Sequence, residues 1–249
     1  MRKVHETTLE VNLNAVVDNL NFYRSFMKPE TKLVCMIKAD GYGAGAVEIA
    51  KTLQDHRVDY LAVAVADEGV TLRKNGITSN IMIMNPEMTA FKTMFDYDLE
   101  PEVYSFRLLD ALVKAAEREG VTGFPVHIKL DTGMHRLGFD PEHDMEELID
   151  RLKHQNAIIP RSVFSHFVGS DSDGFDEFSA HQFALFEKGS TELQENLEKA
   201  EKKIREAAAE GANIILLPEL FEREYFCQQR RYDFYHYAKP AEENEAVQM

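Results

Sequence analysis

Short apolar runs along the chain alternate with longer stretches in which apolar residues recur every three or four positions. A short apolar run is typical of a buried strand, and spacing by three and four is typical of a helix with one buried face. The runs that we interpret as strands span residues 33–37, 60–65, 80–85, 100–105, 124–130 and 160–167. Helical spacing precedes the first run and recurs between the others, so the order predicts a repeated βα unit.

Strands that are apolar on both faces and separated by helices indicate a parallel sheet covered on two sides. An open doubly wound sheet and a (β/α)8 barrel both fit that pattern. The first run is not followed by GxGxxG, and polar residues follow several different strands, which favours the barrel. The predicted fold class is therefore α/β, a partial (β/α)8 TIM-type barrel with six strands.

The composition of the chain limits the kinds of partner that we expect it to bind. A formal net charge of -15 argues against nucleic acid and against an anionic membrane surface, because both are bound through a basic face. Two cysteines, Cys35 and Cys227, provide neither a disulfide framework nor metal-ligand spacing. No apolar run approaches the roughly 20 residues of a spanning helix. We expect a cytoplasmic protein with a small-molecule ligand and no metal.

Polar residues stand where the predicted strands end, which is where a barrel carries its active site. Lys38 and Tyr42 follow the first strand within "LVCMIKADGYGAG", Lys129 and Arg136 follow the fifth, and His166 ends the sixth. A lysine amine aimed into a barrel mouth can condense with an aldehyde, and pyridoxal phosphate is the cofactor that most often uses such a lysine. A neighbouring cation such as Arg136 would favour the free amine.

Four segments resemble alanine racemases and occur in the order of that family. They read "CMIKADGYGAG", "YLAVAVADEGVTLRKNGI", "HIKLDTGMHRLGF" and "SHFVGSDSD". The resemblance implies a pyridoxal 5'-phosphate barrel over residues 1–194 and interconversion of L-alanine and D-alanine for cell-wall precursors. It also implies alanine as the small-molecule partner and a homodimer.

The resemblance also implies a role for each residue at the strand ends. Lys38 would carry pyridoxal phosphate and act as the base on the D-alanine side. Tyr42 would approach the cofactor phosphate, and His166 would pack against the pyridine ring. Arg136 would contact the phenolic oxygen and the substrate carboxylate, and Lys129 resembles the lysine that can be carbamylated to hold that arginine.

From residue 195 the pattern changes to a charged amphipathic helix, then Gly211, then the apolar run "NIILLPEL". This order resembles the start of the carbon-nitrogen hydrolases, a nitrilase-type α/β fold, and "LFEREYFCQQRRYDFYHYAKP" is similar to the N-carbamoylputrescine amidase branch. Glu219 would then be an amidase-type general base, and Cys227 a packing thiol. We therefore predict a hybrid of a racemase-like barrel, 1–194, and a hydrolase-like fragment, 195–249, with "NIILLPEL" in the position of a seventh strand.

Racemases of this family continue into two more strands and a C-terminal β domain, which supply the base on the opposite face and most dimer contacts. The sequence given contains neither, so we expect impaired racemisation. Three alternatives stay open, namely a non-catalytic barrel that binds pyridoxal phosphate, an inert hybrid and a carbon-nitrogen hydrolase fragment. Alanine turnover with bound cofactor would exclude the first, and amidase activity lost on Glu219→Gln would support the last.

Overall fold

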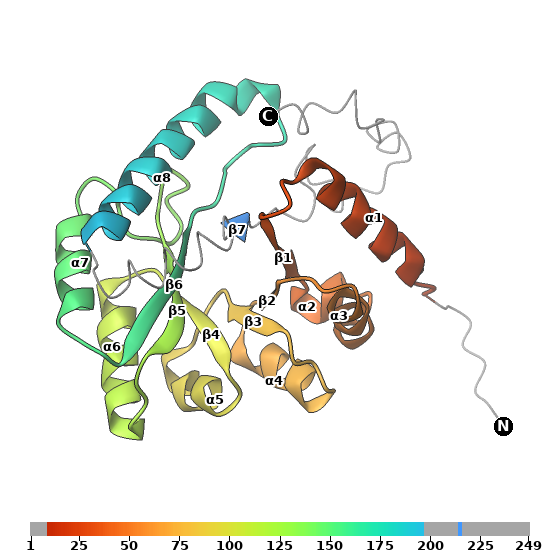
Figure 1. The fold of residues 1–249 in the computed structure, drawn as a ribbon, viewed down its shortest axis with the longest axis horizontal. Helices are drawn as coiled ribbons and strands as arrows, with labels where there is room; N and C mark the ends of the chain where they lie inside the picture. Colours follow the sequence, from red (N-terminus) through yellow and green to blue (C-terminus); the bar gives the residue numbers. More distant parts are fainter. Residues whose placement is uncertain (1–8, 197–213, 216–249) are drawn as a thin grey trace.

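The computed structural model describes residues 9–196 and 214–215, which form a curved parallel sheet with helices along its outer side (Figure 1). The strands lie in the order β6-β5-β4-β3-β2-β1-β7. Their bounds are β1 (Lys32–Met36), β2 (Tyr60–Val63), β3 (Asn80–Ile83), β4 (Leu99–Val103), β5 (Phe124–Lys129), β6 (Ile158–Phe164) and β7 (Ile214–Ile215). The six predicted strands and the partial barrel are confirmed.

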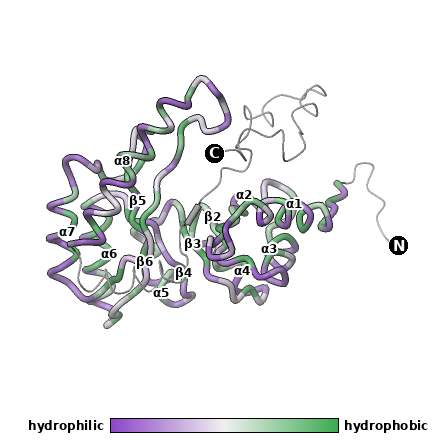
Figure 2. Tube along the Cα trace, turned by 45° about the horizontal axis from the view of Figure 1, so that its top comes forward, coloured by the Kyte–Doolittle hydropathy of each residue, from purple (hydrophilic) through white to green (hydrophobic). Residues whose placement is uncertain are grey.

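The helices connect successive strands, as a parallel sheet requires. They are α1 (Leu13–Phe26), α2 (Lys38–Tyr42), α3 (Ala46–Asp55), α4 (Ala66–Lys74), α5 (Phe91–Asp96), α6 (Phe106–Glu119), α7 (Met145–Lys153) and α8 (Asp176–Asn196), with 3-10 turns η1 (Met88–Ala90) and η2 (Asp173–Phe175). Figure 2 shows hydrophilic and hydrophobic residues alternating along α6, α7 and α8. Each helix therefore has an apolar side available for packing on the sheet.

Helix α6 illustrates how the sequence sets these elements. Its N-cap Ser105 accepts a hydrogen bond from the backbone of Leu108, and it ends at Gly120, which adopts a left-handed φ of 70°. A serine N-cap and a left-handed glycine C-cap satisfy backbone groups that the helix itself leaves unpaired. The residues between them bury an apolar stripe that includes Leu109 and Leu112.

The sheet has two differently composed faces. The outer face packs its strand residues, such as Leu61 and Ile83, against the helices in the main hydrophobic core. A second, smaller cluster contains strand residues alone, among them Val34, Ala62 and Phe164, so it marks the concave inner face. Five polar or charged side chains of the strands are also buried, namely Glu100, Glu102, His127, Lys129 and Ser162. Buried charge on the inner face is the feature that shapes the candidate site.

Strand β7 differs from the predicted seventh-strand position. It is paired in parallel with β1, with Lys32 opposite Ile214 and Leu33 opposite Ile215, and it also approaches β6. A sheet edge exposes unpaired backbone donors and acceptors, and β7 pairs those of β1. Glu219 and Cys227 lie outside the described residues, as does most of the predicted fragment 195–249. None of the helices described is long and apolar enough to cross a membrane.

Candidate active site

Three strands bring nitrogen-bearing side chains to one edge of the sheet. Lys38 follows β1, Lys129 ends β5, and His166 comes two residues after β6. Burial, together with the positive charges of Arg136, Lys129 and Lys38, lowers the pKa of His166 to about 4. The structure thus gathers four of the predicted residues around one point, and His166 is neutral there at physiological pH.

The turn after Lys38 is a left-handed helical turn. Ala39, Asp40 and Gly41 have φ values of 52°, 53° and 62°, and Tyr42 has a φ of 57°. Each residue other than glycine costs about 1–2 kcal/mol in this conformation, so the surrounding contacts must hold the turn. One such contact is internal, because the Asp40 side chain accepts a hydrogen bond of 2.9 Å from the backbone of Ala46.

Glu68 on α4 supplies the second contact. Its Oε1 accepts from the backbone N–H of Ala39 at 2.6 Å, and its Oε2 accepts from Ala64 at 2.7 Å and from Val65 at 3.3 Å. One carboxylate therefore ties the residue beside Lys38 to the end of β2. Sequence reasoning missed Glu68, whose only local signal is its position in the first turn of α4.

Tyr42 stands close to Lys38 on the same turn. The Lys38 Nζ lies 5.8 Å from the centroid of the Tyr42 ring, and 40% of Tyr42 is exposed. The spacing of four residues across a helical turn, although left-handed here, returns the tyrosine to the side of the lysine. Both residues therefore lie at the mouth of the barrel.

Lys129 lies deeper and is paired with an acid that sequence reasoning did not select. Its Nζ lies 3.2 and 3.4 Å from the two carboxylate oxygens of Glu102, and 5.4 Å from the centroid of the Phe164 ring. Lys129 is 4% exposed and Glu102 is not exposed at all. Burial raises the pKa of Glu102 to about 7, against the attraction of Lys129 and Arg136.

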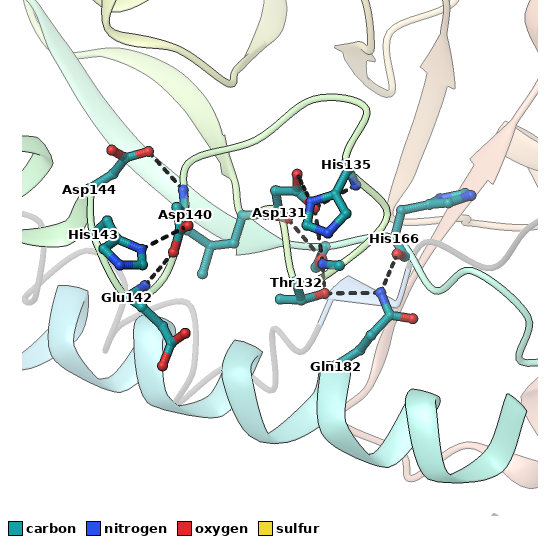
Figure 3. Close-up of polar contacts among 12 residues, drawn as sticks. Asp131, Thr132, His135, Asp140, Glu142, His143, Asp144, His166 and Gln182 are labelled. Atoms are coloured by element: carbon teal, nitrogen blue, oxygen red, sulfur yellow. Dashed lines mark hydrogen bonds and ion pairs between the residues drawn. The ribbon is translucent and has the colours of Figure 1, made fainter.

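The loop after β5 carries Arg136 back over this pair. Its base is closed by backbone hydrogen bonds from Phe139 to Lys129 at 2.9 Å and from Asp131 to Phe139 at 2.8 Å. Asp131 Oδ1 then accepts from the backbone of Gly133 and of His135, which shapes the tip of the loop (Figure 3). Arg136 is exposed, and its charge acts on both Glu102 and His166.

A second buried acid lies one layer below the site. Glu100 contacts His127 at 2.9 Å, Arg161 at 2.8 Å and the Tyr60 hydroxyl at 3.1 Å. Burial alone would raise the pKa of Glu100, but hydrogen bonding and charge from His127, together with the charge of Arg161, hold it below its ordinary value. His127 also bonds Ser162 at 2.7 Å, so this network joins β2, β4, β5 and β6.

Among the residues described, no group of three or more histidine, cysteine, aspartate and glutamate side chains is arranged to hold a metal ion. The functional groups of the site are an amine at Lys38, a neutral imidazole at His166 and an exposed guanidinium at Arg136. Together they suit an anionic organic ligand with an electrophilic carbon.

Comparisons with known proteins relate the chain to one family. Residues 11–221 match the family model described as alanine racemase, N-terminal domain. The chain is 38% identical over 215 residues to an alanine racemase of Clostridium kluyveri, covering 85% of this chain and 53% of that protein. It is 33% identical over 195 residues to an alanine racemase of Methanococcus maripaludis, covering 77% of this chain and 51% of that one.

Solved structures give the same result. An alanine racemase of Clostridium difficile 630 in complex with cycloserine superposes with a TM-score of 0.70 at 35% identity, over 74% of this chain and 50% of that one. The chain thus spans about half the length of the relatives that it matches. The family match also runs past Gln194 to residue 221, and the comparisons lend no support to the hydrolase resemblance of 195–249. On the strength of that match and of the six-stranded half-barrel, the chain belongs to the alanine racemase family, whose N-terminal domain it contains.

Proposed function

We propose that this chain binds pyridoxal 5'-phosphate at Lys38 and interconverts the enantiomers of alanine. The observation that carries the proposal is the positive field at the barrel mouth, where Lys38, Lys129 and Arg136 all act on His166. The chain as a whole has a net charge of -15, so a local excess of positive charge marks a place for an anion. A phosphorylated aldehyde is an anion that a lysine amine can also hold covalently.

The residues present fit this cofactor. The turn after Lys38 contains Gly43 and Gly45, and an added Cβ at Gly43 would meet no atom within 4 Å, so the backbone there faces open space. Tyr42 is on the same turn and is proposed to contact the phosphate. His166 has a flat ring that burial keeps neutral, so it can pack on a pyridine ring without adding charge.

Bound pyridoxal phosphate supplies an electron sink for the α carbon of an amino acid. Lys38 is proposed to move the α proton on the D-alanine side through its Nζ. Arg136, which is exposed on the loop after β5, is proposed to orient the substrate carboxylate and the phenolic oxygen by charge-assisted hydrogen bonds. Lys129 is proposed to support Arg136, and Glu102 is attracted to both of these charges.

The first test asks where the cofactor attaches. The full chain is incubated with pyridoxal phosphate, reduced with borohydride and digested, and the modified lysine is identified by mass spectrometry. We expect modification of Lys38, loss of that modification in Lys38→Ala, and no change in Lys92→Ala, which removes an exposed lysine of α5. Labelling spread over surface lysines and unchanged in Lys38→Ala would refute the cofactor site.

The second test asks whether the chain racemises. L-Alanine is incubated with the loaded chain, and D-alanine is measured by chiral chromatography, with Lys38→Ala as the blank. Formation of D-alanine above that blank supports the proposed activity. Specific labelling of Lys38 without D-alanine would overturn the activity and leave a non-catalytic binding barrel, which was one of the alternatives predicted from the sequence.

A further inference from the structure

A buried glutamine on α8 lies behind the candidate site. Gln182 is 1% exposed and uses both ends of its amide (Figure 3). Its Nε2 donates to Thr132 Oγ1 at 3.2 Å and to the His166 carbonyl at 3.1 Å, and its Oε1 accepts from the backbone of Val168 at 3.0 Å. The three partners belong to the loops after β5 and β6.

The partners fix which way the amide points. The His166 carbonyl can only accept and the Val168 N–H can only donate, so the NH2 and the oxygen of Gln182 have one consistent orientation. The donor and acceptor roles of the neighbouring hydroxyls are fixed as well. Ser165 Oγ donates to the Leu130 carbonyl at 2.8 Å, and it therefore accepts from the Thr132 hydroxyl at 2.7 Å. Every polar atom of this network has a partner.

The network connects the two loops that carry the site residues. On one side Gln182 holds the backbone of His166, whose imidazole points away from the glutamine (Figure 3). On the other side it holds Thr132, which directly follows Asp131, the carboxylate that shapes the loop of Arg136. Helix α8 also backs this loop at Gly133, where an added Cβ would lie 2.8 Å from the Phe178 ring.

We propose that Gln182 is a positioning residue that sets the distance between the His166 ring and the Arg136 loop, and so shapes the binding site for the cofactor. The consequence for cofactor binding rests on the proposed function, whereas the positioning of His166 does not. A glutamine suits this task because it both donates and accepts, and it joins a carbonyl, an N–H and a hydroxyl with a single side chain. A residue with only one of these abilities leaves a buried partner unsatisfied.

The chain offers a matched control in Gln155. That residue also makes three hydrogen bonds, donating to the carbonyls of Leu152 and Ile158 and accepting from the backbone of Ile158. Gln155 lies before the N-terminal end of β6, whereas the partners of Gln182 lie beyond the C-terminal ends of β5 and β6. Gln182→Met and Gln155→Met therefore remove the same number of hydrogen bonds at nearly constant side-chain volume, at opposite ends of one strand.

The first readout needs no cofactor. In the full chain labelled at histidine, the His166 resonance is assigned by its loss in His166→Gln, and its titration is followed by NMR. The native pKa of His166 is expected near 4. We expect Gln182→Met to raise this pKa toward 6.5, because the ring leaves its partly buried position near the cations, and Gln155→Met to leave it unchanged. Equal pKa values in all three proteins would overturn the proposal.

The second readout is retention of pyridoxal phosphate, measured as the fraction of Lys38 fixed by borohydride at increasing cofactor concentration. We expect the half-saturating concentration to rise on the order of tenfold in Gln182→Met and to change little in Gln155→Met. Gln182→Glu keeps the shape but turns a carboxylate oxygen toward the His166 carbonyl, so it should weaken retention as well. An equal change in Gln182→Met and Gln155→Met would mean a general loss of stability and would overturn the positioning role. If the native chain retains no cofactor, the proposed function fails, and the His166 titration still decides the role of Gln182.

Discussion

The buried pair of Glu102 and Lys129 predicts an unusual dependence of stability on pH. Burial raises the pKa of Glu102 from 4.5 to about 7 in the folded chain. Between these two values the folded state holds a proton that the unfolded state has released. The free energy of unfolding must therefore fall as pH rises through this range, which is the reverse of the usual behaviour of a paired carboxylate.

The size of the effect follows from the two pKa values. A rise from 4.5 to about 7 corresponds to about 3 kcal/mol. The stabilisation is complete below pH 4.5 and is lost as pH rises through 7. Glu102→Gln removes the titrating group and keeps the shape. The free energy of unfolding of the native chain, minus that of Glu102→Gln, should fall by about 3 kcal/mol from about pH 5 to about pH 8.

Urea unfolding of both proteins at a series of pH values measures this difference in the free energy of unfolding. The other titrating groups are present in both proteins, so their contributions cancel to first order. Glu147→Gln is the control, because Glu147 lies at the surface beside Arg151, and surface pairs contribute about 0–1 kcal/mol. Lys129→Met tests whether Lys129 influences the pKa of Glu102. It removes an attraction that lowers the pKa of Glu102, so the decline should move to higher pH. A difference that is flat between pH 5 and pH 8, or that rises, would refute the reasoning.

Three further predictions concern the turns around the site and the outer core. Gly138→Ala should destabilise the loop of Arg136, because Gly138 has a φ of 139° and the new Cβ would meet the Asp131 nitrogen and lie 2.6 Å from the Leu130 carbonyl carbon. We expect the free energy of unfolding in urea to fall by more than about 2 kcal/mol, and an unchanged free energy would contradict this prediction. Glu68→Gln places an NH2 against backbone donors at the turn of Lys38 and should cost about 1–2 kcal/mol in the same assay, whereas an unchanged midpoint would show that these hydrogen bonds contribute little. Burial raises the pKa of Cys35 to about 12, so in a Cys227→Ser background the native chain should react with a thiol reagent at about pH 8 on the order of 10³-fold more slowly than the unfolded chain, and comparable rates would contradict the burial.

The positions of the six strands along the chain could be predicted because each strand is apolar where it faces the helices. Strand β4 marks the limit of that reasoning, since its sequence "LEPEV" alternates apolar and acidic residues. Alternation usually indicates one face in water, yet Glu100 and Glu102 are 5% and 0% exposed and face the barrel interior. Their partners come from other strands, so the pattern within β4 contains no sign of them.

The strand-end residues could be placed from the sequence because parallel strands end at the same edge of a sheet. Lys38, Lys129 and His166 were selected in this way, and the structure brings them together. Gln182 and Glu68 could not be found, because their role depends on contacts across 50 and 29 positions of sequence. Left-handed backbone at Ala39 and Asp40 was also beyond prediction, since glycine is the residue that favours it.

Glu100 and Glu102 lie on the same strand, but their surroundings shift their pKa values in opposite directions. The two acids are two residues apart and both are buried, but Glu100 has hydrogen-bonding partners in His127, Tyr60 and Arg161, whereas Glu102 has Lys129. Three partners outweigh the cost of burial and lower the pKa of Glu100, and one partner does not, so the pKa of Glu102 rises to about 7.

This difference bears on the field at the barrel mouth. An acid with a pKa near 7 is protonated in about half of the molecules at neutral pH, so Glu102 cancels the charge of Lys129 only in part. A fully ionised Glu102 would leave Arg136 and Lys38 as the only net cations acting on His166. Incomplete compensation of Lys129 thus adds to the positive charge that Arg136 and Lys38 already give the mouth, within a chain of net charge -15, and this charge would favour the anionic phosphorylated cofactor proposed above.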